Sequence, residues 1–425
     1  MLHRPPPQPT IAYLAPELTA LSETFVYQEL AALEALGYRV LPYAVHPAAV
    51  PAREAQGIAS RTTVLYQGSL LRQVVQGVRE ARRLPRAWPA LKTLLQDMRS
   101  VGWFDRRAWT LLFQWLAAAR MVPALNAAQC THIHAHFVHV PTQIAMYASA
   151  LSGIPFTCTA HANDLFRNGL LLAQKAQRAR KMLTISHYNK AWLQEQGVAP
   201  EQVDVVRCAP DIATRETPRT ARHSGAYRIG TLCRLVEKKG VDDLLRALAR
   251  LVRGGCAPVR LLVAGDGPER LRLQLLADQL GVHAHVDFVG VVAHHAVAQW
   301  MRSLDLFVAP CKVDRSGDVD GIPVALMEAM SLGLPVVSTR LSGVPELVVD
   351  GKTGLLAEPG DPASLAACIE RAMGQPDHAR AWGTAARAHV RWEFGREVNL
   401  RRLVQHFGDE PAVQAEQPAP EQAAA

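Results

Sequence analysis

The chain has 425 residues, of which 49% are hydrophobic and 20% are charged. This balance excludes a chain that is disordered over most of its length, and the length exceeds what one core usually supports, so we expect two domains. No apolar run reaches the roughly 18 residues that span a bilayer, and prolines interrupt the amino terminus before a signal-peptide core forms. We therefore expect a cytoplasmic protein. The net charge of +8 indicates an anionic partner: a nucleotide, a membrane surface or a nucleic acid.

The first half of the chain alternates short β-rich segments with segments of helical period, which is typical of parallel sheets crossed by helices. We expect strands at 10–16, 38–45, 131–137, 155–161, 181–186 and 202–208. A helix is expected over 22–37, capped by Ser22 and ended by Gly37. These elements predict a first doubly wound domain over residues 1–208.

Residues 70–126 form a helical insertion in that domain, rich in arginine and tryptophan. Amphipathic helices of this kind either cover the sheet or contact a membrane surface or a lipid acceptor, and the sequence leaves both interpretations open.

A second alternating series follows a polar, proline-rich linker at 209–226. Strands are expected at 227–235, 259–267, 285–290, 305–310 and 334–339, and helices at 240–255, 268–281 and 294–304. The second of these helices should open at Pro268, a favourable first helical residue. The series predicts a second doubly wound domain over 227–390, and the low-complexity residues 409–425 are expected to form a disordered tail.

Ligands of open α/β sheets bind outside the carboxyl ends of the strands, often at helix amino termini. Arg234 and Lys239 follow the first strand of the second domain, where their charges can converge on one diphosphate. The alternative is a solvated basic loop. Gly265 and Gly267 permit close approach of a ligand, although ordinary turn chemistry explains them equally well.

The segment "VDGIPVALMEAM" places Asp320 in a loop and Glu328 on the following helix. A helix starting after Pro323 directs the amides of 324–326 toward the cleft. An acid in an apolar helix is costly unless it finds donors, so Glu328 needs ribose hydroxyls or a buried arginine. Glu346, in the next strand-to-helix turn, is either a surface helix-start acid or a ligand contact.

His132, His134 and His136 alternate in "THIHAHFVHV", which puts them on one face of a strand. Three neutral imidazoles could bind zinc, with His139 as a fourth candidate. The alternative, which we favour, is that these histidines line the acceptor side of the cleft.

The segments "RLVEKKG", "GDGPER", "DGIPVALMEAMSLGLPVVST" and "SGVPELVVDGKTGLL", in this order and spacing, resemble the carboxy-terminal half of the retaining family 4 glycosyltransferases. The resemblance covers most of residues 227–407. "HIHAHF" and "TAHANDLF" resemble the exopolysaccharide and colanic-acid-type subgroup. The resemblance implies the GT-B fold, an α/β architecture of two Rossmann-like domains facing across a cleft, with a last helix over 391–408 that returns to the first domain.

The same resemblance implies roles for individual residues. Arg234 and Lys239 match the pair that holds the donor diphosphate, and Glu328 matches the acid on the nucleotide ribose. Asp320 matches a glutamate expected on the donor sugar, and His161 matches the histidine that faces that sugar. The expected donor-binding set is Arg234, Lys239, Gly265, Gly267, Gly290, Gly321, Ile322, Pro323, Val324 and Glu328. The expected acceptor-side set is Ser22, Glu23, Thr24, His136 and Asp164, the first three standing where many members have a glycine-rich loop.

The implied activity is retaining transfer of a sugar from a nucleotide-sugar to a hydroxyl of a glycan or polyprenyl-diphosphate-linked acceptor, without a metal or another cofactor. Helix amides and the basic pair would stabilise the leaving diphosphate. A sugar-nucleotide epimerase, a non-catalytic nucleotide-sugar-binding protein and a nucleic-acid-binding protein are the alternatives. The last is disfavoured because no reading motif accompanies the arginines, so nucleic acid is not an expected partner. The expected location is the cytoplasm, with contact to the inner face of the plasma membrane through the insertion.

Overall fold

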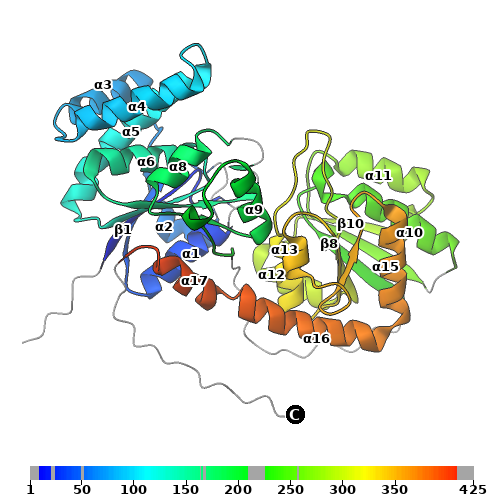
Figure 1. Ribbon diagram of the computed structural model, residues 1–425. Helices are drawn as coiled ribbons and strands as arrows, with labels where there is room; N and C mark the ends of the chain where they lie inside the picture. Colours follow the sequence, from blue (N-terminus) through cyan, green and yellow to red (C-terminus); the bar gives the residue numbers. More distant parts are fainter. Residues whose placement is uncertain are drawn as a thin grey trace, which may run out of the picture.

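The computed structural model describes residues 9–20, 24–48, 52–162, 164–165, 169–208, 225–255 and 258–408. These residues form two parallel sheets, each with helices on both faces, in two lobes (Figure 1). The expected α/β fold of two Rossmann-like units is confirmed. The predicted linker, except for its last two residues, and the predicted tail lie outside the described residues.

The sheet of the first lobe has the strand order β3-β2-β1-β4-β5-β6-β7, and all its pairs are parallel. Its strands are β1 (Thr10–Ala15), β2 (Arg39–Ala44), β3 (Thr63–Val64), β4 (His132–His136), β5 (Phe156–Ala160), β6 (Lys181–Thr184) and β7 (Val203–Val205). Because side chains alternate along a strand, Tyr13 points into the core on one face of the sheet and Leu14 into the core on the other.

The helices of this lobe are α1 (Thr24–Ala35), α2 (Gln56–Ala59), α3 (Leu70–Ala81), α4 (Ala87–Val101), α5 (Arg106–Ala127), α6 (Val140–Ser152), α8 (Leu172–Arg178) and α9 (His187–Glu195). α1 ends before Gly37, whose φ of +92° suits glycine, as predicted. Its predicted cap, Ser22, lies outside the described residues. α3, α4 and α5 stack on α6 at the far end of the lobe, in the segment predicted as an insertion (Figure 1).

The sheet of the second lobe has the order β10-β9-β8-β11-β12-β13, again all parallel. Its strands are β8 (Tyr227–Leu232), β9 (Val259–Ala264), β10 (Val286–Gly290), β11 (Leu306–Ala309), β12 (Val336–Thr339) and β13 (Leu355–Ala357). Its helices are α10 (Val241–Arg253), α11 (Arg270–Gln279), α12 (His294–Arg302), α13 (Val324–Ser331), α14 (Val344–Leu347) and α15 (Pro362–Gly374). The prediction that Pro268 opens α11 is wrong: the amide of Glu269 donates to the Leu235 carbonyl, which keeps this stretch in a turn.

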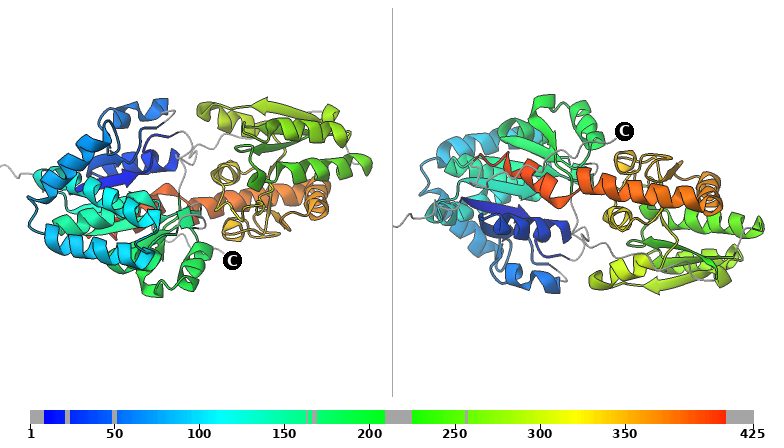
Figure 2. Two further views of the ribbon diagram at one scale, coloured as in Figure 1. Left: turned by 90° about the horizontal axis from the view of Figure 1, so that it is seen from above. Right: turned by 90° about the horizontal axis from the view of Figure 1, so that it is seen from below.

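The carboxy-terminal segment crosses between the lobes as two helices, α16 (Pro376–Glu393) and α17 (Arg396–Val404), and not as the single helix predicted over 391–408 (Figure 2). Phe394 is fully buried in the second lobe, whereas Leu403 is buried in the first, so the chain must turn between them. The side-chain amide of Asn399 donates to the carbonyls of Glu393 and Gly395 and so stabilises the break. α17 then packs on α1.

Candidate active site

A cavity of about 800 Å³ lies between the two lobes. The second lobe lines it with the ends of β8 and β11, the start of α12 and the start of α13, and the first lobe adds the start of α1 and residues near 52–54. Its volume suits a small-molecule ligand. Of the residues predicted for the site, it is lined by Thr24, Arg234, Lys239, Pro323, Val324 and Glu328.

The amino terminus of α13 forms one wall of this cavity. Pro323 caps the helix in an extended conformation, and the first helical amides, those of Val324 and Ala325, have no acceptor within the helix. Free amides and the positive end of the helix dipole attract an anion. The predicted helix start is therefore correct, and it faces the cavity.

The side chains of Arg234 and Glu328, both on the cavity wall, make no hydrogen bond with another described residue. Arg234 is exposed in the loop after β8, and Glu328 is part-buried on α13. Burial raises the pKa of the Glu328 carboxyl, and the nearby His294 opposes that shift. No buried arginine among the described residues pairs with the Glu328 carboxylate. This carboxylate is therefore open to a ligand.

Lys239 reaches the cavity from the short helix η4 (Glu237–Lys239) and pairs with Asp320. Lys238 pairs with the same carboxylate at 3.3 Å. Burial alone would raise the pKa of Asp320, but the two ammonium groups outweigh it and the pKa is lowered. Asp320 itself does not line the cavity, so the structure places it behind Lys239 and not where the resemblance expects a contact with the donor sugar.

The predicted glycines Gly265, Gly267 and Gly290 also lie behind the cavity wall. A Cβ on Gly265 would lie 1.8 Å from the carbonyl oxygen of Cys233, and one on Gly267 would lie 2.4 Å from that of Leu235. These glycines therefore let the turn after β9 pack against the loop that carries Arg234. Gly290 has a φ of +79° where β10 ends.

Gly321 meets the first lobe, whereas Ile322 packs against the core of the second. A Cβ on Gly321 would lie 3.1 Å from Ile185 Cδ1 and 3.2 Å from Ala162 Cβ. The loop that holds Asp320 thus touches the loop that holds His161, although the two loops belong to different lobes.

His161 is 6% exposed and lies beside this contact. Its Nε2 is 3.1 Å from Nδ1 of His136, and its Nδ1 is 3.6 Å from the sulfur of Cys208. Asp164 accepts hydrogen bonds from the backbone amides of His161 and Val138, so it fixes the loop and does not reach the cavity. Burial raises the pKa of Asp164 to about 7.

The three alternating histidines do share one face of β4, as predicted, but they do not line the cavity. His132 and His134 both contact Oγ1 of Thr157 at 2.8 Å and stack near Phe407 of the carboxy-terminal segment. His136 was expected on the acceptor side of the cleft. It is only 1% exposed, so it does not form part of such a surface. The alternation of residues along β4 predicts that the three histidines share one face. It does not predict that the segment covering this face comes from the carboxy-terminal end of the chain.

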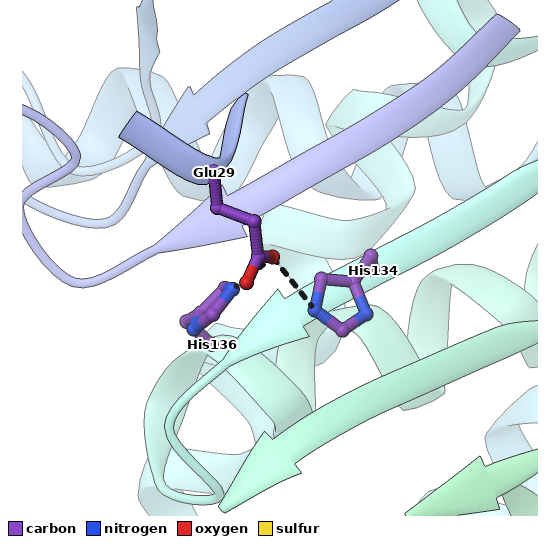
Figure 3. Close-up of side chains that lie close together, drawn as sticks. All are labelled: Glu29, His134 and His136. Atoms are coloured by element: carbon purple, nitrogen blue, oxygen red, sulfur yellow. Dashed lines mark hydrogen bonds and ion pairs between the residues drawn. The ribbon is translucent and has the colours of Figure 1, made fainter. Parts of the chain in front are cut away.

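Among the described residues, one set of three potential metal ligands lies close together: Glu29, His134 and His136, whose ligand atoms are all within 4.8 Å of one another (Figure 3). Glu29 comes from α1 and points between the two imidazoles. His139 does not join them; its ring stacks on Phe137 at 5.6 Å. Sequence reasoning missed Glu29 because nothing local to α1 indicates which strand its side chain faces.

Two family profiles together match almost the whole described chain. The family described as "Glycosyltransferase Family 4" matches residues 22–214, and the family described as "Glycosyl transferases group 1" matches residues 214–389. By sequence, the first half of the chain belongs to Glycosyltransferase Family 4 and the second half to Glycosyl transferases group 1.

Known relatives of the chain are named as glycosyltransferases. A putative colanic acid biosynthesis glycosyltransferase of Salmonella typhimurium is 35% identical over 58% of this chain and 58% of its own length. The chain thus matches less than two thirds of that relative. The amylovoran biosynthesis glycosyltransferase AmsK of Erwinia amylovora is 29% identical over 93% of this chain and 98% of its own length. The structure of Anabaena HepE in complex with UDP has a TM-score of 0.70 at 18% identity, covering 93% of this chain and 98% of HepE, which supports the GT-B fold.

The cavity also contains residues that sequence reasoning missed. Tyr27 and Glu54 line it from the first lobe, and their side chains form a hydrogen bond of 3.4 Å. Ser22 and Glu23, predicted in the same region, lie outside the described residues. His294 and His295 line the cavity at the start of α12.

Glu346 is neither a simple surface acid nor a cavity residue. Its carboxylate accepts hydrogen bonds from the backbone amides of His187 and Tyr188, at the start of α9 in the other lobe, at 3.0 and 2.9 Å. Arg207 pairs with it at 2.8 Å. Glu346 therefore joins the two lobes that enclose the cavity.

Proposed function

We propose that the protein transfers a sugar from a nucleotide-sugar donor to a hydroxyl of a glycan or polyprenyl-diphosphate-linked glycan in cell-surface polysaccharide biosynthesis, with retention of the anomeric configuration. One observation carries the proposal: Arg234, Lys239 and the free amides of α13 converge on one cavity that also holds the unpaired Glu328. Relatives named for colanic acid and amylovoran biosynthesis, and HepE structures that hold UDP, support it.

The donor diphosphate would bind at the amino terminus of α13, between the cations of Arg234 and Lys239. Glu328 would accept hydrogen bonds from the ribose hydroxyls. Base contacts would come from the segment near His294 and His295. Asp320 would act through Lys239, whose ammonium it holds at the cavity wall.

Chemistry in this site would need no nucleophile from the protein. As the bond between the sugar and the phosphate breaks, charge develops on the leaving diphosphate, and Arg234, Lys239 and the α13 amides stabilise it. A leaving-group oxygen takes the proton of the incoming hydroxyl on the same face of the sugar, which retains the configuration. Fixed cations supply the counter-charge, so the proposal includes no metal ion. Contact between the lobes would limit hydrolysis by excluding water.

The helical layer α3–α5 is proposed to place the acceptor side of the enzyme on the inner face of the plasma membrane. Among the described residues, ten of the seventeen exposed large hydrophobic side chains lie between residues 70 and 113. They are Leu70, Leu71, Val75, Val78, Trp88, Leu95, Trp103, Phe104, Trp109 and Phe113. Arginines and lysine accompany them, which favours an anionic lipid surface. No described helix is long and apolar enough to cross the bilayer.

The activity is tested by incubating the purified protein with a panel of nucleotide-sugars, with and without polyprenyl-diphosphate-linked glycan acceptors. We expect release of the nucleoside diphosphate that depends on the acceptor, and a product whose anomeric configuration, determined by NMR, matches that of the donor. Isomerisation of a donor without acceptor would instead identify an epimerase. Donor binding without any turnover, across the panel, would identify a binding protein. Inversion of configuration would overturn the retaining mechanism alone.

A further inference from the structure

A chain of hydrogen bonds runs from α1 through β4 to His161. Nε2 of His136 lies 3.0 Å from Oε1 of Glu29 and 2.6 Å from the Tyr13 hydroxyl. Nδ1 of the same ring lies 3.1 Å from Nε2 of His161. Figure 3 shows the Glu29 carboxylate on one side of His136. The ring of His136 therefore connects this carboxylate with His161, which lies on its other side.

Both imidazoles carry a single proton near neutral pH. Burial lowers the pKa of His136 to about 3 and holds the pKa of His161 well below its usual value. A neutral imidazole has one donor and one acceptor nitrogen, so each hydrogen bond in the chain fixes the direction of the next.

The direction starts at Glu29. Burial raises the pKa of its carboxyl, and His134 and the Tyr13 hydroxyl oppose that shift. Its Oε1 accepts the hydrogen bond from Tyr13 and lies 3.0 Å from Nε2 of His136, so it is an acceptor on this side of the ring. The Tyr13 hydroxyl has one proton and two acceptors beside it, Oε1 of Glu29 at 2.9 Å and the Val26 carbonyl at 3.2 Å. Donation to either of them leaves the Tyr13 oxygen as an acceptor for His136. Both partners on this side of His136 are thus acceptors, which places the proton on Nε2. Nδ1 of His136 is then bare and must accept from Nε2–H of His161.

The far nitrogen of His161, Nδ1, is consequently bare. Its neighbour is the thiol of Cys208 at 3.6 Å, a weak donor. A sugar hydroxyl is a stronger donor to a bare nitrogen than a thiol is. This bare nitrogen can accept a hydrogen bond from a hydroxyl that reaches it, although His161 is not one of the residues that line the cavity.

We propose that Glu29 is a positioning residue that acts through His136 to fix the tautomer and orientation of His161, so that Nδ1 of His161 accepts a hydrogen bond from a hydroxyl of the donor sugar. The assignment to the donor sugar rests on the proposed function, whereas the tautomers do not. Helix α1 connects the chain of hydrogen bonds with the cavity. Its first residue, Thr24, lines the cavity, and Glu29 follows little more than a turn later.

The tautomers are measured by NMR on the full-length protein with 15N-labelled histidine at pH 7.5. We expect Nε2 to be protonated and Nδ1 bare in both His136 and His161. The opposite tautomer of His161 in the unaltered protein would overturn the proposal without any variant. Stoichiometric zinc or another metal in the purified protein would also overturn it, because the metal would occupy Nε2 of His136.

Glu29→Ala removes the fixed acceptor, and the Tyr13 proton is then free to turn toward His136. We expect the His161 signals to move toward a mixture of tautomers and kcat to fall about 10- to 100-fold with a smaller change in KM. Glu29→Gln keeps an acceptor oxygen and should recover part of kcat. Glu34→Ala, on the same helix with a carboxylate that pairs with Arg61, is the matched control and should change neither readout.

A purely structural role for Glu29 would lower the thermal unfolding temperature of Glu29→Ala and leave the His161 tautomer and kcat unchanged, which would overturn the proposal. Because the tautomers are measured without substrate, failure of this proposal can be distinguished from failure of the proposed function. A protein with the expected tautomers and no transferase activity would overturn the proposed function alone.

Discussion

At the residue scale, Lys239 serves two partners. Its ammonium pairs with Asp320, and it lines the cavity beside the free amides of α13. Burial would lower the pKa of this lysine, but Asp320 more than offsets that effect and raises it, so the charge persists throughout the physiological pH range. A fixed cation of this kind stabilises a leaving diphosphate because it needs no reorganisation during the reaction.

Lys239→Ala should therefore lower kcat/KM for sugar transfer by about 10²-fold or more, since it removes a charge contact from the transition state. Initial rates of acceptor-dependent diphosphate release measure this. Lys352→Ala, at an exposed turn of the same lobe, is the control and should leave the rate unchanged. Equal rates in the two variants would remove Lys239 from the site.

The buried histidines make folding stability depend on pH. Burial lowers the pKa of His134 and of His136 to about 3, below the value of about 6.5 in an unfolded chain. The unfolded state thus binds more protons between these values, and stability that is present above pH 6.5 is lost as the pH falls toward 3. The raised pKa of Asp164 acts in the opposite direction, as do those of Glu29 and Glu328. Against these three carboxyls, six of the described histidines have a lowered pKa.

We expect the free energy of unfolding to fall between pH 7 and pH 5, with His134 and His136 each contributing about 1.4 kcal/mol per pH unit once fully titrating. Urea unfolding at several pH values measures the slope. His134→Asn should flatten it by about that amount, whereas His283→Asn, an exposed site, should not. A slope that His134→Asn leaves unchanged would show that this imidazole is not buried neutral.

At the element scale, the sequence predicted most strands of both sheets, because buried parallel strands are short apolar runs between turn signals. The break at Phe394 and Gly395 was missed, since it depends on which lobe buries each side chain and not on local propensity. The residues of the candidate site were predicted or missed for the same reason. Arg234, Lys239 and Glu328 were found from their places at strand and helix ends, whereas Tyr27, Glu29 and Glu54 reach their partners only through tertiary packing.

The layer of α3, α4 and α5 yields a prediction of its own. The double substitution Trp103→Ser with Phe104→Ser should weaken binding to vesicles of phosphatidylglycerol and phosphatidylcholine about 10-fold or more, because two exposed aromatic side chains no longer enter the interface. Co-sedimentation with the vesicles measures the bound fraction.

The matched control is Leu271→Ser with Leu275→Ser, two equally exposed apolar residues on α11 of the other lobe. These substitutions should leave vesicle binding unchanged. If both double variants weakened binding alike, the layer would not be the membrane-facing surface.

At the scale of the whole molecule, Glu346 determines how firmly the lobes meet. Removing its carboxylate leaves Arg207, 7% exposed, without its ion pair and the first amides of α9 without an acceptor. Glu346→Ala should therefore lower the free energy of unfolding by about 2–4 kcal/mol and loosen the contact that closes the cavity.

Denaturant unfolding measures the loss of stability, and small-angle X-ray scattering measures the radius of gyration, which should increase. Glu358→Ala removes an exposed carboxylate that pairs with Arg340 in the same lobe, and it should change neither quantity. An unaltered radius of gyration in Glu346→Ala would mean that other contacts alone hold the lobes together.

The return of α17 to the first lobe has a consequence for synthesis. Leu400, Leu403 and Phe407 complete a core that begins with Ile11 and Tyr13, so these contacts of large sequence separation are made by residues that are synthesised long after the first sheet. A nascent chain that has reached residue 208 has all seven strands of the first sheet but an uncovered apolar face and an uncovered row of histidines. Such a fragment should aggregate when expressed alone, and its folding should await the carboxy-terminal helix.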